Sequence, residues 1–392
     1  MIKKVKLPNE KLSGIKMGGG IRDVLDLATK IEKSGRTIYH LEIGRPDFDS
    51  PQTAKDAAIK AIQDGFVHYA DMRGVEELRV TLSKKLARDN KIDVSPADIL
   101  ITVGAAAALS TAAITILNRG DEVIVPVPCF LSYPALCEMT GAKAVKLPCR
   151  FENGFLLDPD DLEAAVTDKT RMLILNSPNN PSGAVLRKDV IERIAEIAIK
   201  HDLIVVSDEC YERFLYAGEH ISIGSLPGMG ERTITVGAAS KTYSMTGWRV
   251  GYMAMPDWVT PHANRTHLFL NTSPTTFAQY GYENALRNAE PDVVRMIKEY
   301  RERRDLVIGY LRDMPQFDIV VPDGAFYVFP RVAAGAQKTD VELCSYIMEE
   351  AGVAIVPGEA FETPGFVRIA YCKQKDYLTS AMECMKKALK KL

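Results

Sequence analysis

Residues 238–249 read AASKTYSMTGWR and follow a short apolar segment, residues 233–236, that has the composition of a β-strand. Lys241 is the single lysine of this stretch, and Arg249 follows it eight positions later. A lysine at the end of a buried strand loses water, which lowers the pKa of its amine and makes the amine nucleophilic toward carbonyl groups. Its small neighbours leave room for a flat ligand. The alternative interpretation is an exposed loop, where most lysines lie.

Similar short apolar segments recur on both sides of this stretch and alternate with longer segments of helical periodicity, such as residues 191–201. The alternation predicts an α/β fold with a mostly parallel, doubly wound sheet. Strands that are apolar throughout are typical of a sheet covered by helices on both faces. The predicted strands are residues 99–103, 122–125, 143–147, 171–175, 203–207, 233–236 and 248–253.

After about residue 285 the pattern becomes that of a smaller α+β unit, which starts with a long charged helix at residues 291–314. We expect residues 1–45 to form an N-terminal segment that packs with this smaller unit. Residues 46–285 would then form a large domain, and residues 286–392 a small C-terminal α+β domain. Further elements of the small domain are expected at residues 317–321, 325–329, 340–351, 353–356 and 366–371.

The composition is that of an ordinary globular protein: 392 residues, 46% hydrophobic and 26% charged. The net charge of -2 argues against a nucleic-acid partner or an acidic membrane surface. The seven cysteines show no paired spacing and the N-terminus shows no signal-peptide pattern, so we expect a cytoplasmic protein with reduced thiols. The six histidines show no metal-ligand spacing, so no metal site is expected.

In an open α/β sheet, ligands bind beyond the carboxyl ends of the strands. The first predicted strand is followed by Gly104, Ala105 and Ala106, where free N–H groups at a helix start could hold a phosphate. A plain tight turn explains these residues equally well. The fourth strand is followed by residues 176–183, NSPNNPSG, which most simply form a turn.

The fifth strand is followed by Asp208 and, three residues later, Tyr211. A carboxylate at the end of a buried strand is costly unless it meets a positive partner, such as a protonated ring nitrogen. Lys241 and Arg249 follow the next strand. A carboxylate, a lysine, a helix start and an arginine at successive strand ends suit a ligand with a ring nitrogen, an aldehyde and a phosphate, which is pyridoxal 5′-phosphate.

At this point the chain resembles the class I and II aminotransferases of fold type I, and within them the branch of bacterial aspartate and aromatic aminotransferases. The resemblance implies a large domain with a mostly parallel doubly wound sheet and a smaller α+β domain. It implies an enzyme that moves the α-amino group of an L-amino acid to a 2-oxo acid, by a ping-pong route through pyridoxamine phosphate. The motifs that carry it are residues 44–48 (GRPDF), 180–183 (NPSG), 208–211 (DECY), 240–241 (SK), 247–249 (GWR) and 368–371 (RIAY).

The resemblance implies three catalytic residues. Lys241 would bind the cofactor through its amine and then transfer protons. Asp208 would keep the ring nitrogen protonated, so that the ring accepts electrons. Tyr211, together with Asn180, would donate a hydrogen bond to the phenolic oxygen of the ring.

The resemblance also implies how the rest of the cofactor is held. The turn at Gly104 and the N–H groups of Ala105 and Ala106 would bind the phosphate. Ser240 and Arg249 would bind the same phosphate from the next strand end.

Further residues are implied to contact the substrate or the second subunit. Phe130 would stack on the cofactor ring and, with Asn180, line the substrate site. Arg368 would pair with the substrate α-carboxylate through two parallel hydrogen bonds, which a lysine could not make, and Gly44 would contact the same group. Tyr69 would reach the phosphate of the neighbouring subunit, which implies a homodimer with active sites at the interface.

Three positions depart from the pattern of many relatives. Ala238 stands where a serine or threonine binds the phosphate, and Phe130 where many relatives have tryptophan. Ala106 stands where relatives specific for dicarboxylates have a lysine, so strict aspartate specificity is not expected. Arg45 could supply a cation instead. The glycine run at residues 18–20 is expected to form a mobile lid.

Two other functions fit part of the pattern. A pyridoxal-phosphate lyase, such as a C–S β-lyase or an enzyme of the aminocyclopropane-carboxylate synthase type, would share every cofactor residue and differ only in its product. A regulator with this fold would carry a DNA-binding helix pair, and the residues before Gly44 lack a basic helix-turn-helix pattern.

Overall fold

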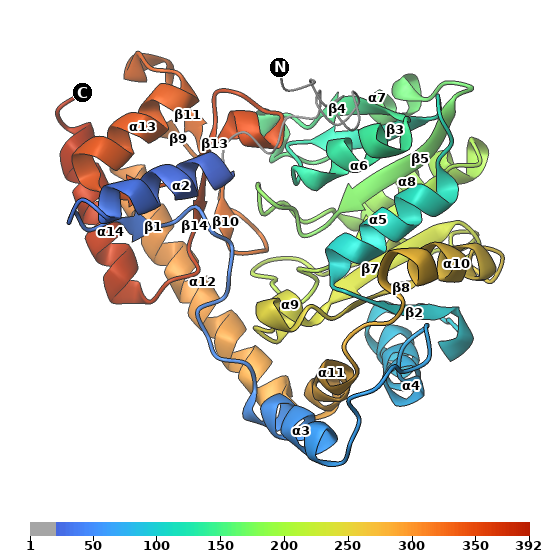
Figure 1. The fold of residues 1–392 in the computed structure, drawn as a ribbon. Helices are drawn as coiled ribbons and strands as arrows, with labels where there is room; N and C mark the ends of the chain where they lie inside the picture. Colours follow the sequence, from blue (N-terminus) through green and yellow to red (C-terminus); the bar gives the residue numbers. More distant parts are fainter. Residues whose placement is uncertain (1–20) are drawn as a thin grey trace, which may run out of the picture.

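The computed structural model describes residues 21–392, in which a central sheet with its helices lies beside a second group of helices and short strands (Figure 1). The expected lid at residues 18–20 lies outside the described residues. The predicted α/β fold class is confirmed. The domain boundaries at residues 45 and 285 stay predictions.

The central sheet has seven strands in the order β2-β8-β7-β6-β5-β3-β4. All of its pairs are parallel except the two made by β8, which is antiparallel to both β2 and β7. The sheet is therefore mostly parallel, as predicted. Its strands are β2 (Ile99–Thr102), β3 (Glu122–Val127), β4 (Lys143–Pro148), β5 (Thr170–Asn176), β6 (Ile204–Asp208), β7 (Thr233–Ala238) and β8 (Gly251–Ala254).

Helices pack on both faces of this sheet. Helices α5, α6 and α10 contact one face, whereas α4, α8 and α11 pack against the apolar clusters of the other face. The helices of this part are α3 (Gln52–Gln63), α4 (Glu76–Lys85), α5 (Ala105–Ile116), α6 (Ser132–Thr140), α7 (Pro159–Ala165), α8 (Lys188–Lys200), α9 (Ala239–Thr242), α10 (Thr260–Asn271) and α11 (Thr276–Asn288).

The inner strands are apolar throughout because successive side chains point to opposite, equally buried faces. In β5, Met172 and Ile174 belong to the apolar cluster under α5 and α6, whereas Leu173 and Leu175 belong to the cluster that contains α8. This alternation fixes the register of each strand, since a shift by one residue would exchange the two faces.

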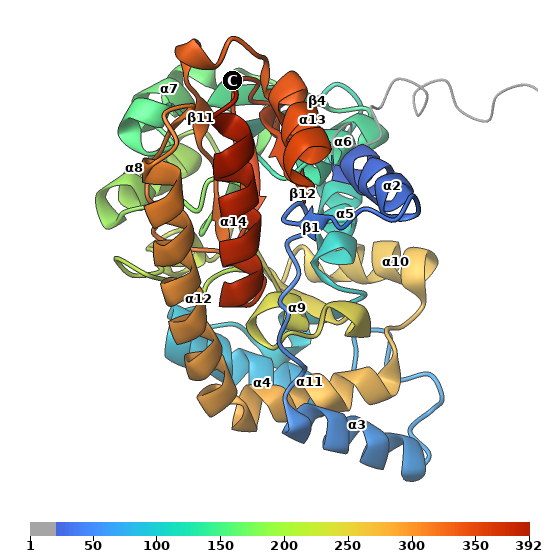
Figure 2. The same ribbon diagram turned by 90° about the vertical axis from the view of Figure 1, so that its left-hand side faces the viewer.

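The second group of elements combines both ends of the described chain. Strand β1 pairs in parallel with β12, so the N-terminal segment lies against the C-terminal part. Helices α12 and α14 run side by side (Figure 2), and β14 pairs with β10 and β13. The elements are α2 (Ile21–Glu32), β1 (Tyr39–His40), α12 (Glu290–Arg312), β9 (Phe317–Asp318), β10 (Tyr327–Val328), β11 (Arg331–Val332), α13 (Asp340–Ala351), β12 (Val353–Ala354), β13 (Val356–Pro357), β14 (Val367–Ala370) and α14 (Lys375–Leu389).

One predicted strand boundary is wrong. The sequence pattern predicts a strand from Trp248, but residues Thr246–Trp248 form a 3-10 turn and β8 begins at Gly251. Arg249 has a φ of 55°, a left-handed conformation that ends the turn and cannot lie within a strand. Trp248 instead donates a hydrogen bond from its indole nitrogen to Ser50 Oγ at 3.0 Å.

Within residues 21–392, none of the helices combines the length and the apolar character that crossing a membrane requires.

The packing of α8 predicts a clear difference between two isoleucines of the same helix. Ile194 is fully buried, whereas Ile199 is 42% exposed. Ile194→Ala should lower the free energy of unfolding by about 2–5 kcal/mol, because it removes buried methyl groups and leaves a cavity. Ile199→Ala serves as the control and should cost less than about 1 kcal/mol. Urea unfolding followed by circular dichroism measures both values, and equal losses would contradict the assigned faces of α8.

Candidate active site

A cavity of about 340 Å³ lies at the carboxyl ends of β5, β6 and β7, where Asn176, Asp208 and Ala238 end these strands. The volume falls in the range of about 300–1,000 Å³ that is usual for small-molecule sites. Adjacent strands bring the ends together because Asn176 pairs with Asp208, and Asp208 with Val236, in the sheet register. Of the residues proposed from the sequence, the cavity is lined by Gly44, Ala105, Ala106, Phe130, Asn180, Asp208, Tyr211, Ser240, Lys241, Arg249 and Arg368.

Lys241 enters this cavity from α9, the single helical turn that follows β7. Its Nζ donates a hydrogen bond to the carbonyl oxygen of Gly44 at 2.7 Å and lies 5.8 Å from the ring centroids of Tyr211 and Phe326. Burial lowers the pKa of this amine, since the charged form loses water. The arrangement favours a neutral, nucleophilic amine that is held at the cavity wall.

Asp208 ends β6 with its carboxylate buried. The hydroxyl of Tyr133 donates to Oδ2 at 2.8 Å, and the backbone N–H of Cys210 donates to Oδ1 at 3.2 Å. Burial raises the pKa of Asp208 even though these two hydrogen bonds oppose the shift. In the described chain no lysine or arginine forms an ion pair with this carboxylate, so it is available to a positively charged ligand group.

Tyr211 lies near Asp208 and is also buried. Its hydroxyl is 2.9 Å from the hydroxyl of Tyr327, which comes from β10 in the C-terminal part. Burial raises the pKa of both tyrosines well above the usual range, so both hydroxyls keep their protons at neutral pH. The pair therefore offers a phenol as a hydrogen-bond donor to a ligand oxygen.

Arg368 reaches the same cavity from β14 and is almost fully buried. Its Nη1 donates to Asn180 Oδ1 at 3.1 Å, and its Nη2 donates to the carbonyl oxygen of Glu42. The guanidinium lies between the rings of Tyr327 and Phe361, at 4.6 and 4.7 Å from their centroids. Its Nε has no hydrogen-bond partner in the described chain, so the group can still bind an anion such as a carboxylate.

Crowding by Tyr327 requires a glycine at position 44. A Cβ atom at this position would lie 1.8 Å from the hydroxyl oxygen of Tyr327, so no side chain fits. The backbone of Gly44 lines the cavity between Lys241 and Arg368.

Positive groups gather at the other end of the cavity. Helix α5 starts at Ala105, where the first N–H groups of a helix have no intrahelical partner. Gly104 does not line the cavity, but its φ is 77° and an added Cβ would lie 2.6 Å from Nη2 of Arg249, so the arginine can approach the helix start. Ser240 lies on the same wall. A helix N-terminus, a hydroxyl and a guanidinium together form a suitable anion site.

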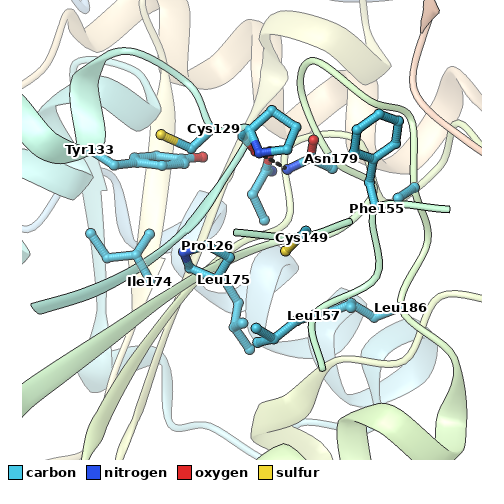
Figure 3. Close-up of a pocket in the computed structure, with 13 residues that line it drawn as sticks. Pro126, Cys129, Tyr133, Cys149, Phe155, Leu157, Ile174, Leu175, Asn179 and Leu186 are labelled. Atoms are coloured by element: carbon cyan, nitrogen blue, oxygen red, sulfur yellow. Dashed lines mark hydrogen bonds between the residues drawn. The ribbon is translucent and has the colours of Figure 1, made fainter. Parts of the chain in front are cut away.

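Phe130 is half-buried and lines the cavity beside Tyr133, with ring centroids 5.9 Å apart. Tyr133 also lines a second cavity of about 30 Å³, together with Cys129, Cys149 and Asn179 (Figure 3). That volume holds about one or two water molecules and not a cofactor. Burial raises the pKa of Cys149 to about 12 and that of Cys129 further, so these thiols stay protonated and serve as packing groups.

Tyr69 and Arg45 lie away from the cavity lining. Tyr69 is 86% exposed, and it does not contact the cavity of its own chain. Arg45 follows Gly44, is exposed and does not line the cavity, and its role as a cation for the substrate stays a prediction.

Sequence reasoning missed three residues that shape the site. Tyr133 holds Asp208, Tyr327 contacts both Tyr211 and Arg368, and Glu42 binds Arg368 through its carbonyl oxygen. The signal for the two tyrosines was a polar ring in an otherwise apolar segment, which packing alone explains equally often. Glu42 contacts Arg368 through its backbone, which leaves no signal in the sequence.

The arrangement suits one flat ligand with three different groups. A basic ring nitrogen would meet Asp208, a carbonyl carbon would meet Lys241, and an anionic group would meet the start of α5 with Arg249. A second, smaller anion would meet Arg368. The cavity can therefore form a covalent bond to a carbonyl and hold a charged substrate beside it.

Comparisons with known proteins agree over nearly the whole chain. The family model described as "Aminotransferase class I and II" matches residues 36–383. The chain is 43% identical over 376 residues to the aromatic-amino-acid aminotransferase 2 of Thermococcus litoralis, covering 94% of this chain and 95% of the relative. It is 42% identical, with the same coverage, to the aspartate aminotransferase of Pyrococcus abyssi. The solved aspartate aminotransferase from Thermus thermophilus with maleate is similar with a TM-score of 0.94 at 37% identity, covering 98% of this chain and 100% of that one.

The lowered pKa of Lys241 predicts selective reaction with an aldehyde. Reductive methylation with formaldehyde, followed by peptide mass spectrometry across a pH series, should modify Lys241 at lower pH than Lys375. Lys375 is the matched control because its hydrogen bond to Glu302 raises its pKa. If the two lysines react with the same pH dependence, the buried amine is not the activated group that the geometry indicates.

Proposed function

The chain belongs to the class I and II aminotransferases, and we propose that it transfers the α-amino group of an L-amino acid to a 2-oxo acid with pyridoxal 5′-phosphate as its cofactor. The reaction class follows from the family and from relatives named aspartate and aromatic-amino-acid aminotransferases. The single structural observation that carries the proposal is the meeting of Lys241, Asp208 and Arg368 in one cavity.

The family generally depends on pyridoxal 5′-phosphate, and the groups in the cavity fit this molecule. Asp208 is buried without a cationic partner in the described chain, and Arg368 has an unpartnered buried N–H. A pyridine nitrogen and a substrate carboxylate would supply the missing partners. When bound, the cofactor supplies a ring that accepts the electrons left on the substrate Cα after that carbon loses its proton.

Asp208 is proposed to hold a proton on the ring nitrogen. The charge on that nitrogen would compensate the buried carboxylate, which lowers the pKa of Asp208 from its raised value and keeps it ionised. Tyr133 donates to Asp208 and thereby orients the carboxylate. Tyr211 and Asn180 are proposed to donate hydrogen bonds to the phenolic oxygen of the ring, and Phe130 to stack on the ring face.

Lys241 is proposed to act as both the attachment point and the acid–base group. Burial lowers the pKa of this amine, which favours the unprotonated form that a nucleophile and a base require. With cofactor and substrate bound, the amine of Lys241 would take the proton from the substrate Cα. The carbonyl oxygen of Gly44, 2.7 Å from its Nζ, holds the amine near the substrate position.

The two anionic ends of cofactor and substrate are proposed to bind at opposite walls. The N–H groups of Ala105 and Ala106, with Ser240 and Arg249, would hold the phosphate at the start of α5. Arg368 would exchange its contacts with protein oxygens for two hydrogen bonds to the substrate α-carboxylate.

The amino-acid range is proposed to extend beyond aspartate. Ala106 places no cation at this part of the cavity, and the neighbouring walls are formed by apolar or aromatic side chains such as Ile43, Leu109 and Phe130. Desolvating a second carboxylate there would be costly, whereas an aromatic side chain would gain from burial. Relatives named for both kinds of substrate support this range.

The protein is proposed to work as a homodimer in which Tyr69 of each subunit reaches toward the other active site. Support comes from the high exposure of Tyr69 and from the apolar side chains of Ile59, Ile62, Phe66 and Val67, which are also exposed. An exposed apolar group of this kind is typical of an interface between proteins. A cytoplasmic location is proposed because all seven cysteines are free, as expected in a reducing compartment.

A single-turnover half-reaction tests the proposed function. Cofactor-loaded protein is mixed with one amino acid at a time, without a 2-oxo acid, while the cofactor absorbance is followed. Aspartate and an aromatic amino acid should each convert the cofactor stoichiometrically and release their own 2-oxo acid. Lys241→Ala should slow the conversion by at least about 100-fold, because it removes the acid–base group, whereas the exposed control Lys60→Ala should not. Persistent cofactor absorbance with release of pyruvate and ammonia would instead identify a lyase.

The geometry of Arg368 predicts a binding defect in a conservative variant. Arg368→Lys keeps the charge but loses the paired hydrogen bonds, so KM for the amino acid should rise about 10- to 100-fold with a smaller change in kcat. Arg295→Lys, on the exposed side of α12, is the matched control. Steady-state kinetics measures both, and an unchanged KM in Arg368→Lys would remove this arginine from the substrate site.

A further inference from the structure

A buried cluster of charged and polar side chains begins at the residue directly after Asp208. Glu209 and Glu212 follow β6, and they meet Lys85 at the end of α4 and His220 from a later loop. None of these four lines the cavity. We call this group, with the neutral residues that contact it, the Glu209 cluster: Lys85, Asn90, Ser207, Glu209, Glu212, His220 and Ser222.

The carboxylate of Glu209 is the centre of the cluster and is fully buried. Oε2 accepts hydrogen bonds from Ser222 Oγ at 2.6 Å, His220 Nε2 at 2.9 Å and Asn90 Nδ2 at 3.0 Å. Oε1 accepts from Ser207 Oγ at 3.0 Å. A buried carboxylate with four donors is rigidly held, so Glu209 fixes the turn that starts at Asp208 without lining the cavity.

Glu212 continues the cluster toward α4. Its Oε2 accepts from Asn90 Nδ2 at 2.8 Å, and its Oε1 forms an ion pair with Lys85. Lys85 Nζ also donates to Asn90 Oδ1 at 2.7 Å. The segment from Glu209 to Glu212, which contains Tyr211, is thus tied at both ends to Asn90, and its Glu212 end is also tied to Lys85.

The charge of the cluster depends on one proton. The buried carboxylate of Glu209, the partly buried carboxylate of Glu212 and the buried Lys85 leave one uncompensated negative charge, which a protonated His220 cancels. Burial lowers the pKa of His220, but the charge of Glu209 and its hydrogen bond outweigh burial and raise the pKa overall. The other charged groups that act on His220 are Glu212, which raises its pKa, and Lys85, which lowers it. Glu219, the neighbour of His220 in the chain, is exposed.

The cluster is linked to the cavity through Asp208. The N–H of Glu209 binds the carbonyl oxygen of Val236 in β7 at 2.9 Å, so the clamped turn is also tied to the strand that precedes Lys241. The charge of Glu209 is among the causes that raise the pKa of Asp208. A change in the net charge of the cluster should therefore shift the pKa of Asp208 and of a cofactor bound next to it.

We propose that His220 and Glu209 are positioning residues for the transamination site: they hold the turn from Asp208 to Tyr211, and the proton on His220 offsets the negative charge of Glu209 that acts on Asp208. This inference rests on the proposed function, because the groups that sense the field are those assigned to the cofactor.

A bound metal ion is a poor alternative occupant of the cluster. Glu209, Glu212 and His220 bring ligand atoms within 4.8 Å of one another, the one such group found in the described chain. However, Lys85 already places a positive charge on Glu212, and four donors already occupy Glu209. Addition of EDTA to the wild-type protein should leave its thermal midpoint unchanged, and a fall would overturn the proposal in favour of a metal site.

A charge cycle tests the proposal on the cofactor-loaded protein. The pH midpoint of the visible absorbance of bound pyridoxal 5′-phosphate is measured for the wild type, His220→Gln, Glu209→Gln and the double variant. His220→Gln leaves a negative charge unbalanced and should shift the midpoint upward by about 0.5–1 pH unit. Glu209→Gln should shift it much less, because the loss of Glu209 also removes the charge that holds the proton on His220. The double variant should return close to the wild type, because the cluster is balanced again. The control His201→Gln, on a half-buried histidine 3.7 Å from Glu163, should cause no shift.

Equal upward shifts in both single variants, or no shift in any variant, would overturn the proposal, since loss of packing would affect Glu209→Gln at least as much as His220→Gln. If the wild type itself bound no cofactor, the proposed function would fail instead.

The cofactor-free protein still tests the cluster in that case. A raised pKa of His220 stabilises the fold below the usual pKa of histidine, and this gain is lost as pH rises through the raised value. The thermal midpoint of His220→Gln should therefore differ most from the wild type at about pH 6 and approach it at higher pH. A difference that does not change with pH would overturn the proposal on this readout too.

Discussion

The arrangement of the cavity depends on a buried carboxylate that has no cation of its own. Asp208 ends the central strand β6, where the sheet register and the helices on both faces remove it from water. Two hydrogen bonds hold it in place, from Tyr133 and from the N–H of Cys210, but they do not cancel its charge. The fold therefore keeps a strong preference for a positive ligand group at this point, at a cost in its own stability.

Two cationic groups of the cavity, those of Lys241 and Arg368, donate hydrogen bonds to backbone oxygens of the N-terminal segment. Lys241 donates to the carbonyl of Gly44, and Arg368 donates to the carbonyl of Glu42, two residues earlier. Strand β1, which precedes this segment, pairs with β12 of the C-terminal part. Residues 42–44 therefore contact both Lys241, which follows β7, and Arg368, which lies in β14. A covalent bond at Lys241 and a substrate carboxylate at Arg368 would replace these two contacts.

The sequence predicted the candidate site best where polar residues follow several neighbouring strands. The polar residues after strands β5, β6 and β7 could be placed at one edge of the sheet, because a parallel sheet brings its strand ends together. Tyr133 and Tyr327 could not, because each enters the cavity from an apolar segment in which a tyrosine is more often a packing residue. The start of β8 was misplaced since the left-handed turn at Arg249 carries no glycine to mark it.

We expect the buried charge of Asp208 to select a protonated ring nitrogen, and one measurement tests this expectation most directly. Nitrogen-15 NMR of the protein loaded with pyridoxal 5′-phosphate labelled at the ring nitrogen reports whether that nitrogen carries a proton. We expect a protonated nitrogen at neutral pH in the wild type and an unprotonated nitrogen in Asp208→Asn. An unprotonated nitrogen in the wild type, or the same signal in both proteins, would contradict it.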